Sequence, residues 1–216
     1  MDVTSEREPM LDPIDRVSEI VFGVLMAMSF TGALSISTAG RQEVRTMMFT
    51  ALGCNLAWGL VDAIMYLLRT ATERRRKKTL LDKLRIANDK PETHRLISDE
   101  LPQLFAAVAG PAALDALHEG LLAVREPSVR LGARDYAAAF GIFALVVLAT
   151  FPVVVPFMFI SQVELALRVS NLLAIVTLFI GGVALGRYTG GRAVVYGLGL
   201  AGVGIALVAA ILALGG

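Results

Sequence analysis

Apolar stretches long enough to cross a membrane dominate this chain. The clearest, residues 47–68 (MMFTALGCNLAWGLVDAIMYLL), contains only two strongly polar residues, Asn55 and Asp62. At the rise of an α-helix it would extend about 33 Å, roughly the thickness of the hydrocarbon core of a bilayer. Residues 69–78 (RTATERRRKK) follow directly and carry six positive charges. An apolar span that ends in a basic cluster is typical of a transmembrane helix that ends at the cytoplasmic face.

The same pattern predicts four further spans, at about residues 17–37, 136–160, 165–185 and 193–214. The connections between neighbouring spans are short, so most of these helices should form hairpins. Pro152 and Pro156 lie on one face of the third span and predict a kink or a break near its far end. The predicted fold is an all-α integral membrane protein with five transmembrane helices.

Residues 70–135 form the one stretch that is both long and polar enough for a water-exposed unit. Leucine and isoleucine recur in it at helical spacing, which predicts short helices near residues 80–87, 91–108 and 111–122. A unit of about 65 residues is marginally stable alone, so we expect it to pack on itself, on a partner copy or on the membrane surface.

These patterns divide the chain into four parts. They are an N-terminal tail (1–16), a transmembrane hairpin (17–69), a cytoplasmic helical insert between the second and third spans (70–135), and the last three transmembrane helices (136–216).

Composition supports a membrane protein and argues against a nucleic-acid partner. The 216 residues are 56% hydrophobic with a net charge of +1, and the mean hydropathy is +0.67. Soluble domains of this length are rarely so apolar, and the lipid bilayer is therefore the expected partner. The N-terminal tail has five acidic residues and no apolar core after a basic start, so we expect the first span to act as its own insertion signal.

The distribution of positive charge predicts the orientation. With the N-terminus inside, only Arg41, Arg45 and Arg168 of the 20 Lys and Arg residues would lie in outer loops. The positive-inside rule therefore places the N-terminus and the helical insert in the cytoplasm and the C-terminus outside. Because no organelle signal is evident, a bacterial inner (plasma) membrane is the expected location.

Asp62 is the most informative single residue. It lies about 10 Å inside the cytoplasmic end of its span by helical rise. A carboxylate at mid-membrane costs about 3 kcal/mol on insertion scales, so it usually implies a partner or a water-filled path. Glu19 lies at a similar depth if the first two spans pair, Asn55 lies two turns from Asp62 on the same face, and Met65 and Met26 could add thioether ligands. Together these residues predict a cation site that opens to the cytoplasm.

Structural interpretations of the same residues stay open. Asp62 could pair with Arg69, and Glu19 could cap the start of a helix. The methionines could be core residues. Cys54, the single cysteine, cannot form an intramolecular disulfide or a zinc site and is expected to be a small buried residue.

Other motifs favour structural roles. The first span carries small and hydroxyl residues, which favour close helix packing over a pore lining: Ser29, Thr31, Gly32, Ser35 and Ser37. Gly197, Gly199 and Gly202 match G-x-G-x-x-G, but no strand precedes them, so they predict a packing face, together with Gly204, and not a dinucleotide site.

In the insert, Asp115, His118 and Glu119 fall on one helical face and are candidates for a divalent metal, with a solvated helix face as the alternative. The basic run 74–78 is expected to contact anionic lipid headgroups. Because no nucleophile triad, HExxH or P-loop appears and no cofactor motif is evident, an enzyme is not predicted.

The chain resembles the vacuolar iron transporter family. Residues 18–24 (SEIVFGV) are similar to the segment that opens the first helix of that family, and residues 61–67 (VDAIMYL) are loosely similar to its second helix, with Met65 at the place of the membrane methionine. The resemblance implies a homodimer whose first two helices line a path for ferrous iron or manganese out of the cytoplasm, in exchange for protons.

Two departures from the family leave two functions open. Leu25 and Met26 stand where the family has an aspartate, and residues 70–135 lack its many metal-binding glutamates. Asp62 could replace the missing carboxylate, which predicts a divalent metal transporter. The alternative is a non-transporting membrane anchor or interaction protein whose cytoplasmic helices bind a partner.

Overall fold

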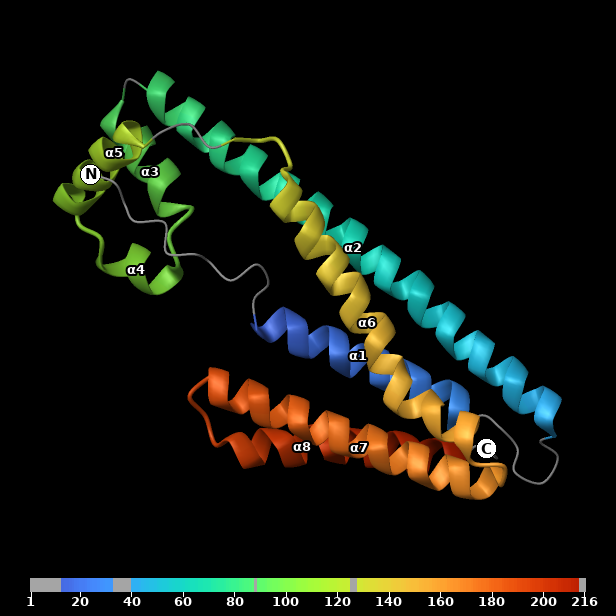
Figure 1. Cartoon of the computed structure of the whole chain (residues 1–216). Helices are drawn as coiled ribbons and strands as arrows, with labels where there is room; N and C mark the ends of the chain where they lie inside the picture. Colours follow the sequence, from blue (N-terminus) through green and yellow to red (C-terminus); the bar gives the residue numbers. More distant parts are fainter. Residues whose placement is uncertain (1–12, 33–39, 88, 125–127, 214–216) are drawn as a thin grey trace. The chain divides into compact units, whose positions relative to one another are not determined.

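The computed structural model describes residues 13–32, 40–87, 89–124 and 128–213, which form eight α-helices and no strand within these ranges. The helices are α1 (Pro13–Gly32), α2 (Arg41–Ile86), α3 (Lys90–Ser98), α4 (Gln103–Val108), α5 (Pro111–Ala123), α6 (Ala133–Phe159), α7 (Val163–Tyr188) and α8 (Ala193–Ala213) (Figure 1). The chain divides into two compact units: the bundle, residues 1–65 and 134–216, and the helical domain, residues 66–133.

Four helices, α2, α6, α7 and α8, are long and apolar enough to cross a membrane, which indicates an integral membrane protein. The described part of α1 is 20 residues long and includes Asp15, Arg16 and Glu19 near its start. The predicted end of the first span, residues 33–37, lies outside the described residues. The count of five transmembrane helices therefore stays a prediction.

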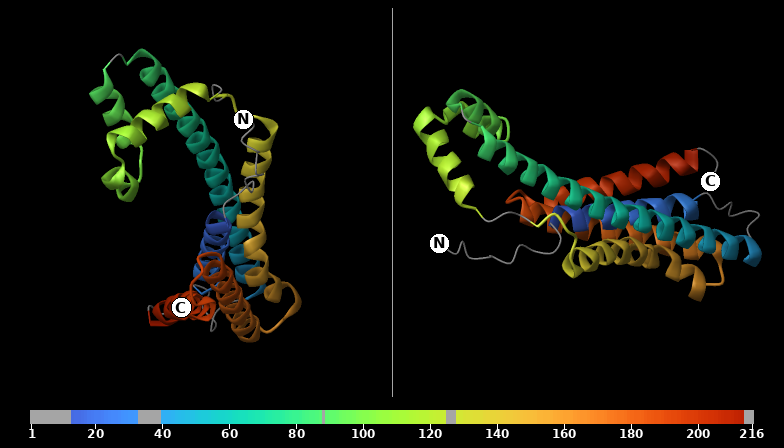
Figure 2. Two further views of the ribbon diagram at one scale, coloured as in Figure 1. Left: turned by 90° about the vertical axis from the view of Figure 1, so that its left-hand side faces the viewer. Right: turned by 90° about the horizontal axis from the view of Figure 1, so that it is seen from above.

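Helix α2 is much longer than the predicted span. It is one helix of 46 residues that continues through the basic cluster and ends at Ile86 (Figure 2). Arginine, lysine and glutamate are good helix formers, so the charges after residue 68 do not stop the helix. The bundle contains α2 up to Met65, and the helical domain contains its remainder.

Helices α7 and α8 form a closely packed antiparallel hairpin, seen side by side in Figures 1 and 2. A Cβ atom added to Gly182 would lie 2.5 Å from the carbonyl oxygen of Tyr196, and one added to Gly204 would lie 2.6 Å from the Leu178 side chain. Gly197 also contacts α7, whereas a Cβ on Gly199 would meet open space. The predicted packing face is therefore confirmed for Gly197 and Gly204.

The core of the bundle lies where α1 meets α6, α7 and α8. One buried cluster contains Val24, Ala27, Met28, Ala149, Val153, Ala174 and Leu178. Gly32 of α1 packs on Ile211 of α8, and Gly181 of α7 faces Val17 and Val21. These small residues let the helices approach closely, as expected for packing in a membrane.

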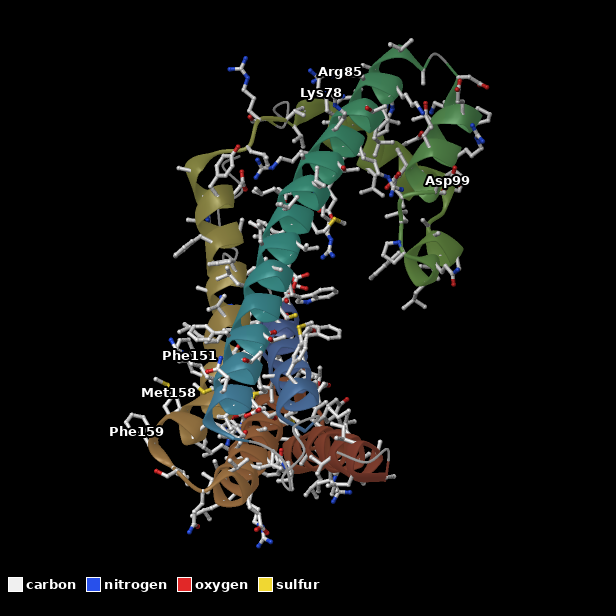
Figure 3. All side chains as sticks on the ribbon, turned by 90° about the vertical axis from the view of Figure 1, so that its right-hand side faces the viewer. Lys78, Arg85, Asp99, Phe151, Met158 and Phe159 are labelled. Atoms are coloured by element: carbon white, nitrogen blue, oxygen red, sulfur yellow. The ribbon has the colours of Figure 1, made fainter. Side chains whose placement is uncertain are left out.

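Helix α6 is continuous through both prolines, so the predicted break is not observed. It ends at Phe159, three residues after Pro156. The side chains of Phe151, Met158 and Phe159 point away from its backbone in Figure 3 and are exposed, as expected for a surface that faces lipid.

The helical domain packs α3 and α5 against the last turns of α2. Its core contains Leu84, Ile97 and Leu114. The predicted helix over residues 91–108 is wrong: it is divided into α3 and α4, because Pro102 lacks an N–H group and disfavours a helical residue before it. Helix α5 begins at Pro111, the start of the predicted helix near residues 111–122.

Candidate functional site

The contact between α1, α2 and α6 encloses the side chain of Asn55. A Cβ on Gly23 would lie 2.9 Å from the Val146 carbonyl oxygen, and one on Gly59 would lie 3.1 Å from the Phe143 carbonyl oxygen. The two glycines thus allow α1 and α2 to approach the backbone of α6. Asn55 is 0% exposed between them, and its Nδ2 donates to the Gly23 carbonyl at 3.3 Å.

Two side-chain oxygens on this face of α2 are buried. Asn55 Oδ1 and Asp62 Oδ2 have no hydrogen-bond donor among the residues that the structure describes. A buried acceptor without a donor costs about 1–3 kcal/mol, and more when it is charged. Such an atom therefore calls for a water molecule, a proton or a cation to complete its coordination.

The predicted alternative of an ion pair for Asp62 is not observed within the described ranges. The alternative for Glu19, a cap at the helix start, does not fit either. Helix α1 begins at Pro13, so Glu19 lies in its second turn, beyond the orphan N–H groups of the first.

Glu19 and Asp62 lie at similar depth in the bundle. Glu19 precedes Gly23 by one turn, about 6 Å, and Asp62 follows Asn55 by two turns, about 10.5 Å. Since α1 and α2 run in opposite directions and Gly23 contacts Asn55, both displacements lead toward the same end of the bundle. The difference in depth is roughly 4.5 Å. One oxygen of Glu19, Oε2, is buried as well.

The structure does not place Met65 with these groups. Met65 is 51% exposed and lies away from the buried face of α2, which carries Ala51, Asn55 and Gly59. Met26 lines an apolar groove between α1, α2 and α8, together with Trp58 and Cys54. Because the lining of this groove is almost entirely apolar, it is unsuited to a cation.

Two polar residues of the bundle were missed by the sequence reasoning. Asp135, in the first turn of α6, is only 7% exposed, and Oδ1 of Asn171 in α7 is buried with no hydrogen-bond donor in the described part of the chain. Asp135 was assigned to the polar insert because it stands at its boundary. Asn171 could have been found by the criterion that identified Asn55, a polar residue inside an apolar span.

The candidate metal ligands of the helical domain, Asp115, His118 and Glu119, are not arranged as a group that could hold a metal ion. Asp115 Oδ1 lies 2.8 Å from His94 Nε2 and its Oδ2 lies 3.0 Å from Lys90 Nζ, while His118 Nε2 lies 3.4 Å from the Leu84 carbonyl oxygen. The carboxylate of Asp115 therefore bonds to α3 and does not join His118 and Glu119. These hydrogen bonds, first that of His94 and then that of Lys90, lower the pKa of Asp115.

Across the described ranges, no group of three or more His, Cys, Asp or Glu side chains is arranged to hold a metal ion. A cation in the bundle would therefore be bound by one or two carboxylates and completed by amide, carbonyl or water oxygens. Transiently bound ions need no larger set of protein carboxylates, since Mn²⁺ and Mg²⁺ accept carbonyl and water ligands.

No family model and no curated protein matches this chain. Its class therefore follows from its own architecture, an all-helical protein with four helices fit to span a membrane and buried carboxylate and amide groups between them.

Proposed function

We propose that this protein transports a divalent metal cation, iron or manganese, across a membrane and is a divergent relative of the vacuolar iron transporters. The observation that carries the proposal is Asp62 Oδ2, a carboxylate oxygen that is buried in an apolar helix with no donor among the described residues. A purely structural carboxylate at this position would be expected to have a hydrogen-bonding or ionic partner.

The chemistry of the neighbouring groups fits a cation. Two turns from Asp62 along α2, the side chain of Asn55 donates its N–H group to the Gly23 carbonyl and leaves its oxygen available. A site that offers oxygens and few donors attracts positive charge and repels anions. Carboxylate and amide oxygens suit Mn²⁺ and ferrous iron, both of which accept hard ligands.

The proposal includes an orientation and an assembly. The end of the bundle nearer Asp62 and Asp135 faces the cytoplasm of a bacterial cell, with the C-terminus outside, and metal leaves the cytoplasm. As in the family that it resembles, two copies form a homodimer. Labelling the two termini in intact spheroplasts with a reagent that does not cross the membrane tests the orientation.

The deciding experiment is uptake of Mn²⁺ and ferrous iron into proteoliposomes by wild type, Asp62→Asn and Asp99→Asn. Asparagine keeps the shape of aspartate and removes its charge. Asp99 is an exposed carboxylate at the end of α3, labelled in Figure 3, and serves as the matched control.

We expect flux from wild type and Asp99→Asn, and a loss of about 100-fold in Asp62→Asn if it is a direct ligand. Folded wild-type protein that carries neither ion above empty liposomes would contradict the proposal. An Asp62→Asn variant with full flux would remove Asp62 from the path.

A second candidate function, an anchor with a protein-binding cytoplasmic domain, is favoured by α4. This short helix exposes Leu104, Phe105 and Val108, with Leu104 75% and Val108 77% accessible. If the protein is such an anchor, wild type carries no metal ion above empty liposomes, and replacing Leu104 and Phe105 with serine abolishes binding of the partner.

A further inference from the structure

Buried polar groups in the bundle continue beyond Asn55 toward the end at which α6 finishes, which we call the far half. Three hydroxyl residues there are 0% exposed: Thr31 of α1, Thr150 of α6 and Ser170 of α7. Asn171 of α7 adds a buried Oδ1 that lacks a donor in the residues described. None of these four residues carries a charge.

The helix contacts bring these groups to one level. Gly181 of α7 faces the turn of α1 between Val17 and Val21. Thr31 lies about 18 Å along α1 from the middle of that turn. Asn171 lies about 15 Å from Gly181 in the same direction, because α7 runs antiparallel to α1. Thr31 and Asn171 therefore differ in depth by roughly 3 Å.

Helix α6 connects the far half with the carboxylates. Ser170 Oγ donates to the Val153 carbonyl of α6 at 2.6 Å, and Val146 of α6 contacts Gly23 beside Asn55. One face of α6 carries Asp135, Val146 and Val153. Val146 follows Asp135 by 11 residues, about three helical turns, and Val153 follows Val146 by 7 residues, about two turns. From Asp135 to Val153 this face extends about 27 Å, close to the thickness of a bilayer core.

The hydrogen bonds of the far half determine what it can bind. Thr31 donates to the Met28 carbonyl, Thr150 to that of Val146, and Ser170 to that of Val153. A hydroxyl has one proton and two lone pairs, so each hydroxyl oxygen has already used its proton and offers only acceptor capacity. Together with Asn171 Oδ1, the far half presents oxygen acceptors to whatever enters it.

We infer that Asn171, with Thr31 and Ser170, forms a second, uncharged station of the metal path. This inference rests on the proposed function. A cation held by Glu19 and Asp62 passes Asn55 and Thr150 and reaches Asn171, where only neutral oxygens coordinate it. Binding is tight at the charged half and weak at the far half, which favours capture at the Asp62 end and release at the other.

The test compares wild type with Asn171→Leu and Thr31→Val in proteoliposomes loaded for Mn²⁺ flux, and measures Mn²⁺ binding in detergent by electron paramagnetic resonance. Thr177→Val is the matched control, because the Thr177 hydroxyl also donates to a carbonyl of its own helix, that of Leu173, but this hydrogen bond is exposed whereas that of Thr31 is buried. Thr31→Val keeps the side-chain volume, so it remains informative if Asn171→Leu does not fold.

We expect a fall in flux of about tenfold in Asn171→Leu and severalfold in Thr31→Val, with Mn²⁺ binding as in wild type because the carboxylates remain. Asp62→Asn, in contrast, loses both binding and flux. If folded Asn171→Leu carries as much flux as Thr177→Val, the second station is overturned and the transporter stays intact. Should Asn171→Leu misfold, the same comparison is made with Thr31→Val. Wild type without binding or flux would overturn the proposed function, and the station with it.

Discussion

One aspartate of the bundle and one of the helical domain lie in opposite surroundings, the first without and the second with hydrogen-bond partners among the described residues. In the helical domain, Asp115 is partly exposed and bonds to His94 and Lys90. In the bundle, Asp62 has a buried oxygen and no such partner in the described chain. Asp115 holds two helices together at little cost, because water and two donors stabilise its charge. The buried oxygen of Asp62 carries a desolvation cost that no hydrogen bond in the described chain offsets, and this cost is the reason for the binding role that we propose for it.

The largest expected effect concerns the close packing of the bundle. Gly182→Val should destabilise the α7–α8 hairpin by about 3 kcal/mol or more, because the new side chain would overlap the backbone at Tyr196. Thermal unfolding in detergent measures this. Gly199→Val is the control, since a Cβ there meets no atom within 4 Å. Equal melting of the two variants would contradict the observed packing.

Replacing an aspartate with leucine should have a smaller effect on stability, of opposite sign in the bundle and in the helical domain. Asp62→Leu removes an uncompensated polar group, so it should stabilise the bundle by about 1–3 kcal/mol while it abolishes metal flux. Asp115→Leu should instead slightly lower the stability of the helical domain. Amide hydrogen exchange resolves the two regions in one experiment. Destabilisation by Asp62→Leu would show that the carboxylate holds the helices together.

The smallest effect is the pH dependence of the helical domain. His94 and Lys90 lower the pKa of Asp115 below its ordinary value of 3.8. The stabilisation from the ionised form is therefore complete above this value and is lost as the pH falls below it. Protection of α3 and α5 amides should decline in acid more steeply in wild type than in Asp115→Asn. Identical acid profiles would show that the Asp115 contacts do not stabilise the domain.

Sequence patterns predicted the apolar helices better than their ends. The apolar run before residue 68 identified a span, but the basic cluster marks an expected membrane boundary and does not end the helix, because arginine and lysine favour α-helix. Pro102 was overlooked as a helix breaker because the hydrophobic spacing continues across it. The predicted end of the first span, residues 33–37, lies outside the described residues.

The candidate site was predicted where polarity alone is informative. Asn55 and Asp62 stand out in an apolar span, and the structure buries both oxygens. Met65 gave no such signal, because a thioether suits both a lipid-facing and a buried position. The pairing of Asp115 with His94 depends on the contact of α3 with α5, which helical spacing within α5 cannot reveal.

The two prolines of α6 have an electrical consequence as well as a mechanical one. A proline in a continuous helix brings no N–H group to the carbonyl four residues before it. Pro152 and Pro156 therefore leave the carbonyls of Leu148 and Pro152 without their usual helical donors. Each such carbonyl is a dipole whose negative end has no helical N–H group opposite it, in the half of α6 that has no ionisable side chain. The backbone itself thus adds a negative potential where the side chains supply only neutral oxygens.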